Sequence, residues 1–228
     1  QNQGTVQEVY VDGEVFGSDG GTNVGGLIGQ NSGDIQESYA TADVSSFGAG
    51  GGLVGHSSGG SITDCYATGL VGGLDGIGGL VGLADNGADI TRSYARGLVQ
   101  LGEDPPEDAR EGGLIGGSDS ITVTHSYWDT DASGQNASAG GTGLSTEEMQ
   151  NSTSYDGSWN FGSGNTWNQD AGINTGYPYL TLSTLHTVSA DVDPEGSGTV
   201  TGSGDYPQGA NAVLEASTAQ GYAFVNWT

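Results

Sequence analysis

The chain has 228 residues, of which 45 are glycine, and 33% are hydrophobic, which is low for one large globular core but sufficient for a narrow solenoid interior. Its 28 Asp and Glu residues face three Arg and no Lys, so the formal net charge at pH 7 is −25. This balance excludes nucleic-acid binding, which needs basic side chains against phosphate, and it disfavours docking on anionic lipid.

The acidic composition also indicates the kind of environment in which the protein works. Dense carboxylates without Lys are typical of proteins from salt-loving organisms, where cations screen the repulsion; an ordinary acidic secreted protein is the alternative. Cys65 is the single cysteine, so no internal disulfide and no thiolate metal cluster is expected. No run approaches the ~18 apolar residues of a membrane span, so we expect no membrane insertion. Because Gln1 is not an initiator Met, we expect the chain to derive from a longer precursor.

A repeat in residues 1–128 decides the expected fold. Four copies of Gly-Gly-Leu-Ile/Val-Gly stand at residues 25–29, 51–55, 78–82 and 112–116, with starts 26, 27 and 34 residues apart. Each is followed by Ile/Val-x-x-Ser/Cys-Tyr, at residues 35–39, 62–66, 90–94 and 123–127, and a degenerate copy at 6–10 precedes the first. Five residues after a tyrosine position come Val15, Val44, Val71 and Val99.

These elements are three to six residues long and are bounded by Gly, Asn, Asp or Ser, which is strand length with turn punctuation. Three such strands per coil of about 26–34 residues predict an all-β fold, a parallel β-helix or β-solenoid. Propeller blades are longer, at about 40 residues, and leucine-rich repeats need several leucines per repeat. Inward slots should keep their residue type, which predicts two buried rows: Leu27, Leu53, Leu80 and Leu114, and Ile35, Ile62, Ile90 and Val123.

Three local features complete the interpretation of the coils. Cys65 takes a slot held by Ser in the other copies, so we interpret it as a core residue rather than a reactive thiol. The repeated glycines should allow positive φ at corners and close approach of successive coils. The acidic segment 100–111, which contains two prolines, explains the 34-residue spacing and predicts a solvated loop, with cation or partner binding as the alternative.

The repeat resembles the GLUG motif family, most closely in Gly-Leu-Val-Gly at 52–55 and Cys-Tyr-Ala-Thr-Gly at 65–69. Ser-Tyr-Trp-Asp-Thr-Asp at 126–131, Gly-Leu-Ser-Thr-Glu-Glu-Met at 143–149 and Gly-Tyr-Pro-Tyr-Leu at 176–180 resemble the closing stretch of such arrays. The resemblance covers about residues 1–182, although the first coil lacks its own Gly-Gly-Leu. It implies large bacterial or archaeal surface proteins, often adhesin-like and sometimes linked to peptidases, and it implies no catalytic residues.

Residues 129–184 form a closing segment rich in aromatics. We expect its aromatic side chains to cover the open end of the solenoid and to prevent edge-to-edge association. The alternative is that Trp159 and Trp167 stack on sugars. Residues 146–150 predict one helical turn, capped by Ser145 or Thr146.

Residues 185–228 form the third predicted unit, a small β module. Val-x-Pro-x-Gly-x-Gly-Thr-Val at 192–200, Tyr-Pro-x-Gly at 206–209 and Gly-Tyr-x-Phe-x-x-Trp at 221–227 resemble the divergent internalin B-repeat-like module of bacterial surface proteins. That family is a small β-rich spacer, usually in tandem. The chain stops where the family continues with further strands, so we expect a partial module.

Candidate chemical groups are few. His56, His125 and His186 are the histidines, and because His125 takes a slot held by Glu37, Asp64 and Arg92 in other coils, we expect a surface position without catalysis. Paired carboxylates could hydrolyse polysaccharides, but three Arg and no Lys disfavour acidic ones. Asp129, Asp131 and Ser133 match the start of a calcium loop whose twelfth position lacks the required Glu.

Residues 191–196 have similar spacing but fit a strand entering a turn better. Asparagine triplets at 136–138, 151–153 and 226–228 fit the glycosylation pattern, which indicates surface exposure. We assign no catalytic, cofactor-binding or metal-binding residue from the sequence.

The sequence thus predicts a secreted or cell-surface structural and adhesive segment that is not an enzyme and carries no cofactor. Its expected partners are surface glycans or other cell-surface proteins. A carbohydrate-binding or polysaccharide-processing β-helix is the alternative class.

Overall fold

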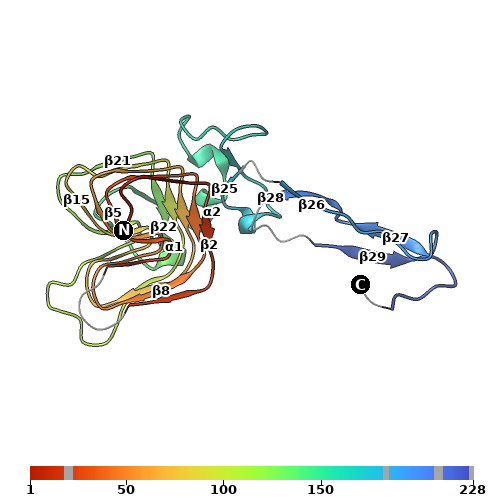
Figure 1. Ribbon diagram of the computed structural model, residues 1–228, viewed down its shortest axis with the longest axis horizontal. Coiled ribbons are helices and arrows are strands. Elements are labelled where there is room, and N and C mark those ends of the chain that lie inside the picture. Colours follow the sequence, from red (N-terminus) through yellow and green to blue (C-terminus); the bar gives the residue numbers. More distant parts are fainter. Residues whose placement is uncertain (18–22, 182–184, 208–212, 226–228) are drawn as a thin grey trace.

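The computed structural model describes residues 1–17, 23–181, 185–207 and 213–225. The described residues up to 129 wind into stacked coils whose strands form parallel sheets along the stack, which is the predicted parallel β-solenoid (Figure 1). A full coil contains five short strands rather than the three we predicted. The first Gly of each Gly-Gly pair forms a strand with the residue before it, and the residues that follow the leucine form another.

Five parallel sheets run along the solenoid, each taking one strand per coil. The first contains β1 (Thr5–Gln7), β6 (Asp34–Gln36), β11 (Ser61–Thr63), β16 (Asp89–Thr91) and β21 (Thr122–Thr124). The second contains β2 (Tyr10–Val11), β7 (Tyr39–Ala40), β12 (Tyr66–Ala67), β17 (Tyr94–Ala95), β22 (Tyr127–Asp129) and β23 (Thr142–Leu144). The third contains β3 (Glu14–Phe16), β8 (Asp43–Ser46), β13 (Val71–Gly73) and β18 (Val99–Leu101). The fourth contains β4 (Val24–Gly25), β9 (Gly50–Gly51), β14 (Ile77–Gly78) and β19 (Glu111–Gly112). The fifth contains β5 (Ile28–Asn31), β10 (Val54–Ser58), β15 (Val81–Asp85) and β20 (Ile115–Ser118).

The two predicted inward rows are confirmed. Leu53, Leu80 and Leu114 have no exposed surface, and the amide of Leu53 donates to the carbonyl of Leu80 at 2.9 Å in the next coil. The isoleucine row is equally buried at its centre, while the terminal members Leu27 and Val123 are half-buried. The valines after the tyrosines pack into a second core with Val24 and Ile77.

Between these two cores the opposite walls of each coil come close together, and we call this narrow part the waist. The close approach explains why the sequence keeps Gly-Gly pairs on one wall and Tyr-Ala pairs on the other. A Cβ added to Gly79 would lie 2.2 Å from the carbonyl oxygen of Gly113 and 2.8 Å from the Cβ of Ala95. The alanines of the second sheet therefore face the glycines across the interior, and both must be small for the walls to approach. Figure 1 shows the coil outline drawn in at this point.

Positive φ occurs at another slot, where we did not expect it. The residue two places before each tyrosine has φ between 44° and 54° in all five copies, and none of these residues is Gly: Glu8, Glu37, Asp64, Arg92 and His125. Glycine at the Gly-Gly pairs is therefore required for close approach rather than for a left-handed backbone.

A hydrogen-bonded column explains the Ser/Cys slot that follows this turn. The Ser93 hydroxyl accepts from the amide of Cys65 at 3.1 Å and donates to the carbonyl of Thr91 at 3.0 Å. Ser126 repeats the pattern one coil further on. Cys65 fits the column because its thiol points to the Thr63 carbonyl at 3.2 Å, and burial raises the pKa of that thiol to about 12. The prediction that Cys65 is a core residue is confirmed.

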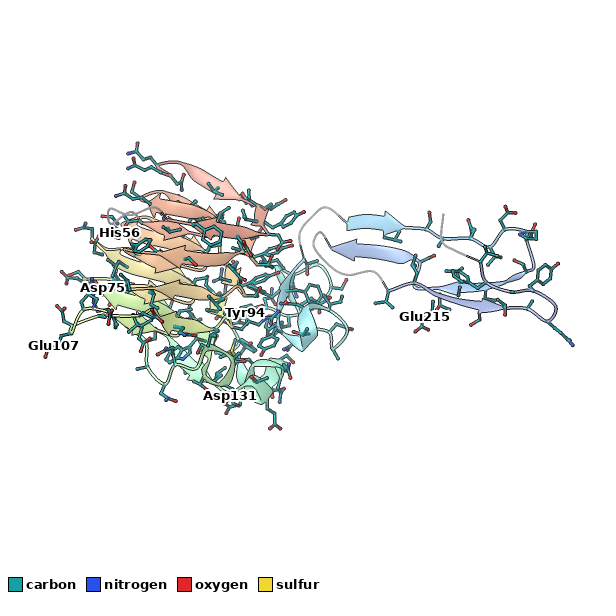
Figure 2. The ribbon with its side chains drawn as sticks, turned by 90° about the horizontal axis from the view of Figure 1, so that it is seen from below. His56, Asp75, Tyr94, Glu107, Asp131 and Glu215 are labelled. Atoms are coloured by element: carbon teal, nitrogen blue, oxygen red, sulfur yellow. The ribbon has the colours of Figure 1, made fainter. Side chains whose placement is uncertain are left out.

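The acidic insertion leaves the stack intact, as predicted, because it loops out between β18 and β19. Its residues 102–108 are exposed, and Glu107 lies at the outer edge of the solenoid in Figure 2. Arg110 anchors the end of the loop through an ion pair of 2.7 Å with Asp75.

Short elements make up the rest of the described chain. The closing segment holds α1 (Thr130–Ser133), α2 (Thr146–Met149), the 3-10 turns η1 (Ser152–Ser154) and η2 (Asn174–Gly176), and the antiparallel pair β24 (Trp167–Asn168) and β25 (Tyr179–Leu180). Ser145 caps α2 through a reciprocal box with Glu148, one of the two caps we predicted. Two antiparallel pairs follow, β26 (Leu185–Val188) with β28 (Gly204–Pro207) and β27 (Gly198–Thr201) with β29 (Glu215–Thr218). Trp227 lies outside the described residues.

Candidate functional site

The outer face of the second sheet carries a row of tyrosines, one from each coil, and the rings of the first four stack on one another. We call Tyr10, Tyr39, Tyr66, Tyr94 and Tyr127 the tyrosine ladder. The rings of Tyr39 and Tyr66 lie 4.6 Å apart at 3°, and those of Tyr66 and Tyr94 lie 5.1 Å apart at 6°. Such a stack arises because in-register parallel strands place identical side chains one strand spacing apart. The residue after each of the three central tyrosines is a buried alanine that points inward, so the tyrosine itself must point out.

The closing segment covers this ladder from the side. Met149, Tyr155, Trp159, Trp167, Tyr177 and Leu180 form one buried cluster with the four later ladder tyrosines. Figure 2 shows Tyr94 where the stacked coils meet the closing segment. Tyr94 is fully buried, and its hydroxyl donates to the Pro178 carbonyl at 2.7 Å. Burial raises the pKa of Tyr94.

Our prediction that these aromatics cover the open end of the solenoid is wrong for Trp159 and Trp167. Both pack across the lateral face, with centroids 4.6 Å apart and each within 6.3 Å of the Tyr94 centroid. The last coil is covered instead by β23, which pairs with β22, and by residues 134–141. Trp128 joins the solenoid core, and its Nε1 donates to the Gln135 carbonyl at 3.0 Å.

The sugar-stacking alternative also fails on geometry. Trp159 and Trp167 expose 3% and 1% of their surface. Both indole N–H groups are committed, that of Trp159 to the His125 carbonyl at 2.7 Å and that of Trp167 to Asp64 at 2.8 Å. Neither ring offers a face on which a sugar could stack.

Two arginines fasten the closing segment to the coils. Arg92 forms two hydrogen bonds with Asp64, at 2.8 and 2.7 Å, and so fixes the carboxylate that accepts from Trp167. Arg96 lies over the ring of Tyr177, with its guanidinium carbon 4.7 Å from the ring centroid. These arginines therefore act in packing.

The residues that match the start of a calcium loop form a helix cap in this structure. Asp129 is fully buried and caps α1 by accepting from the amides of Asp131 and Ala132 at 2.9 and 2.8 Å. Its other oxygen accepts from the hydroxyls of Thr146, at 2.7 Å, and Tyr177, at 2.5 Å. Asp131 accepts from the amide of Thr146, and Ser133 is buried. Among the described residues, no group of three or more His, Cys, Asp or Glu side chains is placed to hold a metal ion.

His56 and His125 form structural contacts. His56 Nε2 lies 3.0 Å from Asp85, and His125 Nδ1 lies 2.5 Å from Asp156. Burial alone would raise the pKa of Asp156, but hydrogen bonds from Ser158, His125 and Tyr127 hold it well below the usual range. His125 is exposed at the left-handed slot, as predicted from the variety of residues there. The backbone of His186 lies in β26.

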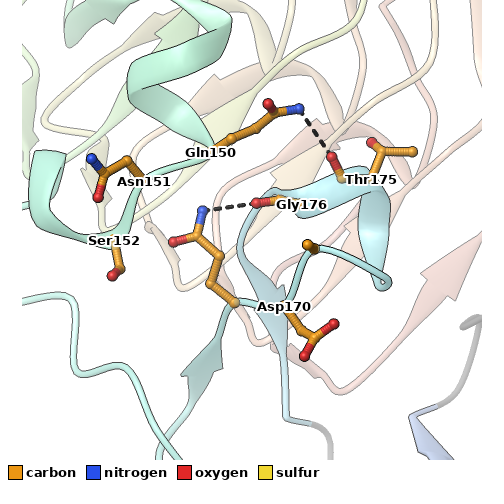
Figure 3. A pocket seen from close by; sticks show the side chains of 8 residues that line it. Gln150, Asn151, Ser152, Asp170, Thr175 and Gly176 are labelled. Atoms are coloured by element: carbon orange, nitrogen blue, oxygen red, sulfur yellow. Dashed lines mark hydrogen bonds between the residues drawn. The ribbon is translucent and has the colours of Figure 1, made fainter.

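A polar pocket of about 490 Å³ opens on the closing segment, between the end of α2 and η2 (Figure 3). It is lined by Gln150, Asn151, Ser152, Gln169, Asp170, Ala171, Thr175 and Gly176. Gln150 donates to the Thr175 carbonyl at 3.0 Å, and Gln169 donates to the Gly176 carbonyl at 2.9 Å. The lining offers amides, hydroxyls and one carboxylate, which suits a neutral, hydroxyl-rich ligand better than an anion.

Sequence reasoning did not find the ladder, its lateral cover or this pocket. The tyrosine in every copy was the available signal, because a large aromatic kept at an outward slot needs a partner. In the described part of the chain, no helix is both long and apolar enough to span a membrane.

The coils, the two cores and the covered ladder define a parallel β-solenoid repeat protein. Family comparison adds that the chain carries GLUG motifs at residues 20–45 and 48–72 and a divergent InlB B-repeat domain at residues 188–228. The GLUG matches fall on the first two of the four Gly-Gly-Leu copies. No curated protein and no solved structure matches the chain. These domains fit a surface repeat protein of adhesin-like type, consistent with an extracellular or cell-surface location.

Proposed function

We propose that this chain is a non-catalytic structural and adhesive segment of a large microbial surface protein, acting as a rigid acidic rod and spacer. The observation that carries the proposal is the continuous in-register stack, in which the inward rows repeat while the outward slots other than the tyrosine ladder vary. A repeated core with a variable surface favours a scaffold, since a conserved chemical site would repeat or concentrate outward polar residues.

The acidic surface supports the same role. With 28 carboxylates and three arginines, the segment stays hydrated and resists self-association, and screening by cations should relieve its internal repulsion. The interpretation as a protein from a high-salt setting rests on this composition alone.

Rigidity can be tested by distance measurement between the ends of the first sheet. Thr5 and Thr122 are both exposed and four strand steps apart, about 19 Å at the usual spacing of about 4.8 Å. Spin labels at Thr5→Cys and Thr122→Cys, in a Cys65→Ser background, should give one narrow distance distribution. A broad distribution, or one that shifts by several ångströms with salt, would refute a rigid rod.

The absence of catalysis is tested by incubating the chain with polysaccharide and peptide panels. We expect no turnover. Turnover that disappears on substitution of a single carboxylate would overturn the proposal and favour the polysaccharide-processing class.

Surface glycans or other cell-surface proteins are the proposed partners. The uncharged amides and hydroxyls of the pocket favour a second candidate, direct glycan binding. Beads coated with the unglycosylated chain should bind neutral glycans, and Gln150→Ala should weaken that binding, while Trp167→Phe should not. Equal binding by the Gln150 variant would remove the pocket from consideration.

A further inference from the structure

We propose that Asn151 is an N-glycosylation site of the folded protein, and that the attached glycan lies over the polar pocket. The chain contains two acceptor triplets in its described part, at residues 136–138 and 151–153. The two triplets differ in their exposure and in their hydrogen bonds, and this difference is the basis of the proposal.

The triplet at 151–153 is open to a modifying enzyme. All three residues are exposed, and Asn151 caps the short turn η1 (Ser152–Ser154), which contains the other two. Asn151 Oδ1 accepts from both the amide and the hydroxyl of Thr153, at 3.1 and 2.9 Å. Its Nδ2, the atom that must form the new bond, donates no hydrogen bond to any described residue. The required hydroxyl and the nucleophilic amide are therefore adjacent and solvent-facing.

The triplet at 136–138 is held by the core. Asn136 is exposed, but the Ser138 hydroxyl accepts from the amides of Leu114 and Ile115, at 3.2 and 2.9 Å, and donates to the Ile115 carbonyl. Residues on both sides of Ser138 also bond to the last coil, from the Gly113 amide to Ala137 and from the Ala139 amide to Ile115. A transferase that recognises the Ser138 hydroxyl must first separate residues 134–141 from the last coil.

The reaction is transfer of an oligosaccharide from a lipid-linked diphosphate donor. Asn151 Nδ2 attacks the anomeric carbon, the C–N bond forms and the C–O bond to the diphosphate breaks. The lipid diphosphate leaves, and the amide proton passes to a carboxylate of the transferase. No oxidant or metal redox change is involved.

The surroundings of Asn151 suit a sugar. Asn151 and Ser152 stand at the rim of the pocket in Figure 3, opposite Asp170. Ser152 Oγ forms no hydrogen bond with a described residue, and Asp170 uses one oxygen for the Gly172 amide at 2.8 Å. These groups can bond to the hydroxyls of the first sugar residues, which places the glycan on the closing segment rather than on the coils.

The test compares the folded chain with unstructured peptides. The full chain, with Asn226→Gln to remove the third triplet, is incubated with an oligosaccharyltransferase and a lipid-linked oligosaccharide, and the glycopeptides are mapped by mass spectrometry. Peptides spanning 130–144 and 145–160 receive the same treatment.

We expect both peptides to be modified, while the folded chain gains one glycan, at Asn151. Thr153→Ser should keep the modification, whereas Thr153→Ala and Asn151→Gln should abolish it. Modification of the folded chain at Asn136 in place of Asn151 would overturn the proposal. So would an unmodified folded chain, whether or not the 145–160 peptide is modified.

Discussion

Replacing Trp167 by alanine should show that the closing segment is fastened to the side of the solenoid. Trp167 is 1% exposed, touches Tyr66, Tyr94 and Trp159, and donates to Asp64. A buried tryptophan covers roughly 150–250 Å². At about 25 cal/mol per Å², its removal costs about 4–6 kcal/mol, near the upper end of the range of about 3–5 kcal/mol seen for such truncations.

The matched control is Trp167→Phe, which keeps most of the ring and removes the N–H group. Asp64 retains both bonds from Arg92, so the lost hydrogen bond should cost about 1–2 kcal/mol. We therefore expect the alanine variant to be less stable than the phenylalanine variant by about 2–5 kcal/mol.

The assay is urea unfolding at fixed salt, followed by circular dichroism and by the fluorescence of the remaining tryptophans. A loss below about 1 kcal/mol for Trp167→Ala would refute the lateral packing. Equal losses for the two variants would show that the Asp64 hydrogen bond, and not aromatic burial, holds the segment.

Four further outcomes test other parts of the structure. Gly79→Ala should cost about 3 kcal/mol of unfolding free energy, because its Cβ would lie 2.2 Å from the Gly113 carbonyl oxygen of the next coil and 2.8 Å from the Cβ of Ala95, while Gly157→Ala, with open space around it, should stay within about 0.5 kcal/mol. Cys65→Ser should change the free energy of unfolding by less than about 1 kcal/mol, because the serine hydroxyl can make the same hydrogen bonds as the thiol. Cys65→Val should cost about 1–3 kcal/mol, because the buried amide of Ser38 would lose its acceptor. The folded pKa of Asp156 is lowered, so the stability it contributes is complete above roughly pH 4 and is lost as pH falls through the folded pKa. Thermal melts from pH 6 to pH 2 should therefore fall less steeply for Asp156→Asn, and an unchanged slope would contradict this. Finally, the melting temperature of the whole chain should rise from low to molar salt with little distinction among monovalent cations, and a flat or falling curve would argue against carboxylate repulsion as the limiting term.

Much of the solenoid could be predicted because its information is local and repeated. A slot that holds Leu in four successive copies must face a constant environment, and the core provides one. The same reasoning placed Cys65 inside, His125 outside and the acidic insertion in a loop. The number of strands per coil was missed, because two-residue strands such as Gly50–Gly51 carry no alternation to detect.

The candidate site was harder to predict because the residues that form it come from separate parts of the sequence and follow no repeated pattern. Asp129 begins with the spacing of a cation loop, and only the folded chain shows both carboxylate oxygens taken by amides and hydroxyls. The amides that line the pocket come from two stretches, around residues 150 and 170, and no sequence pattern links them.

The sequence by itself determined the coil period, the inward rows, the acidic outer surface and the order of the GLUG and B-repeat units. Tertiary structure alone decided what covers the tyrosine ladder. Trp167 meets Asp64 across 103 residues, and Tyr94 meets Pro178 across 84. Side-chain alternation fixes which face of a strand looks outward, but the path by which a distant segment returns depends on the packing of the whole chain. As a result, the closing segment packs against the side of the solenoid rather than over its open end. Trp159 and Trp167 are therefore buried instead of being available to sugars.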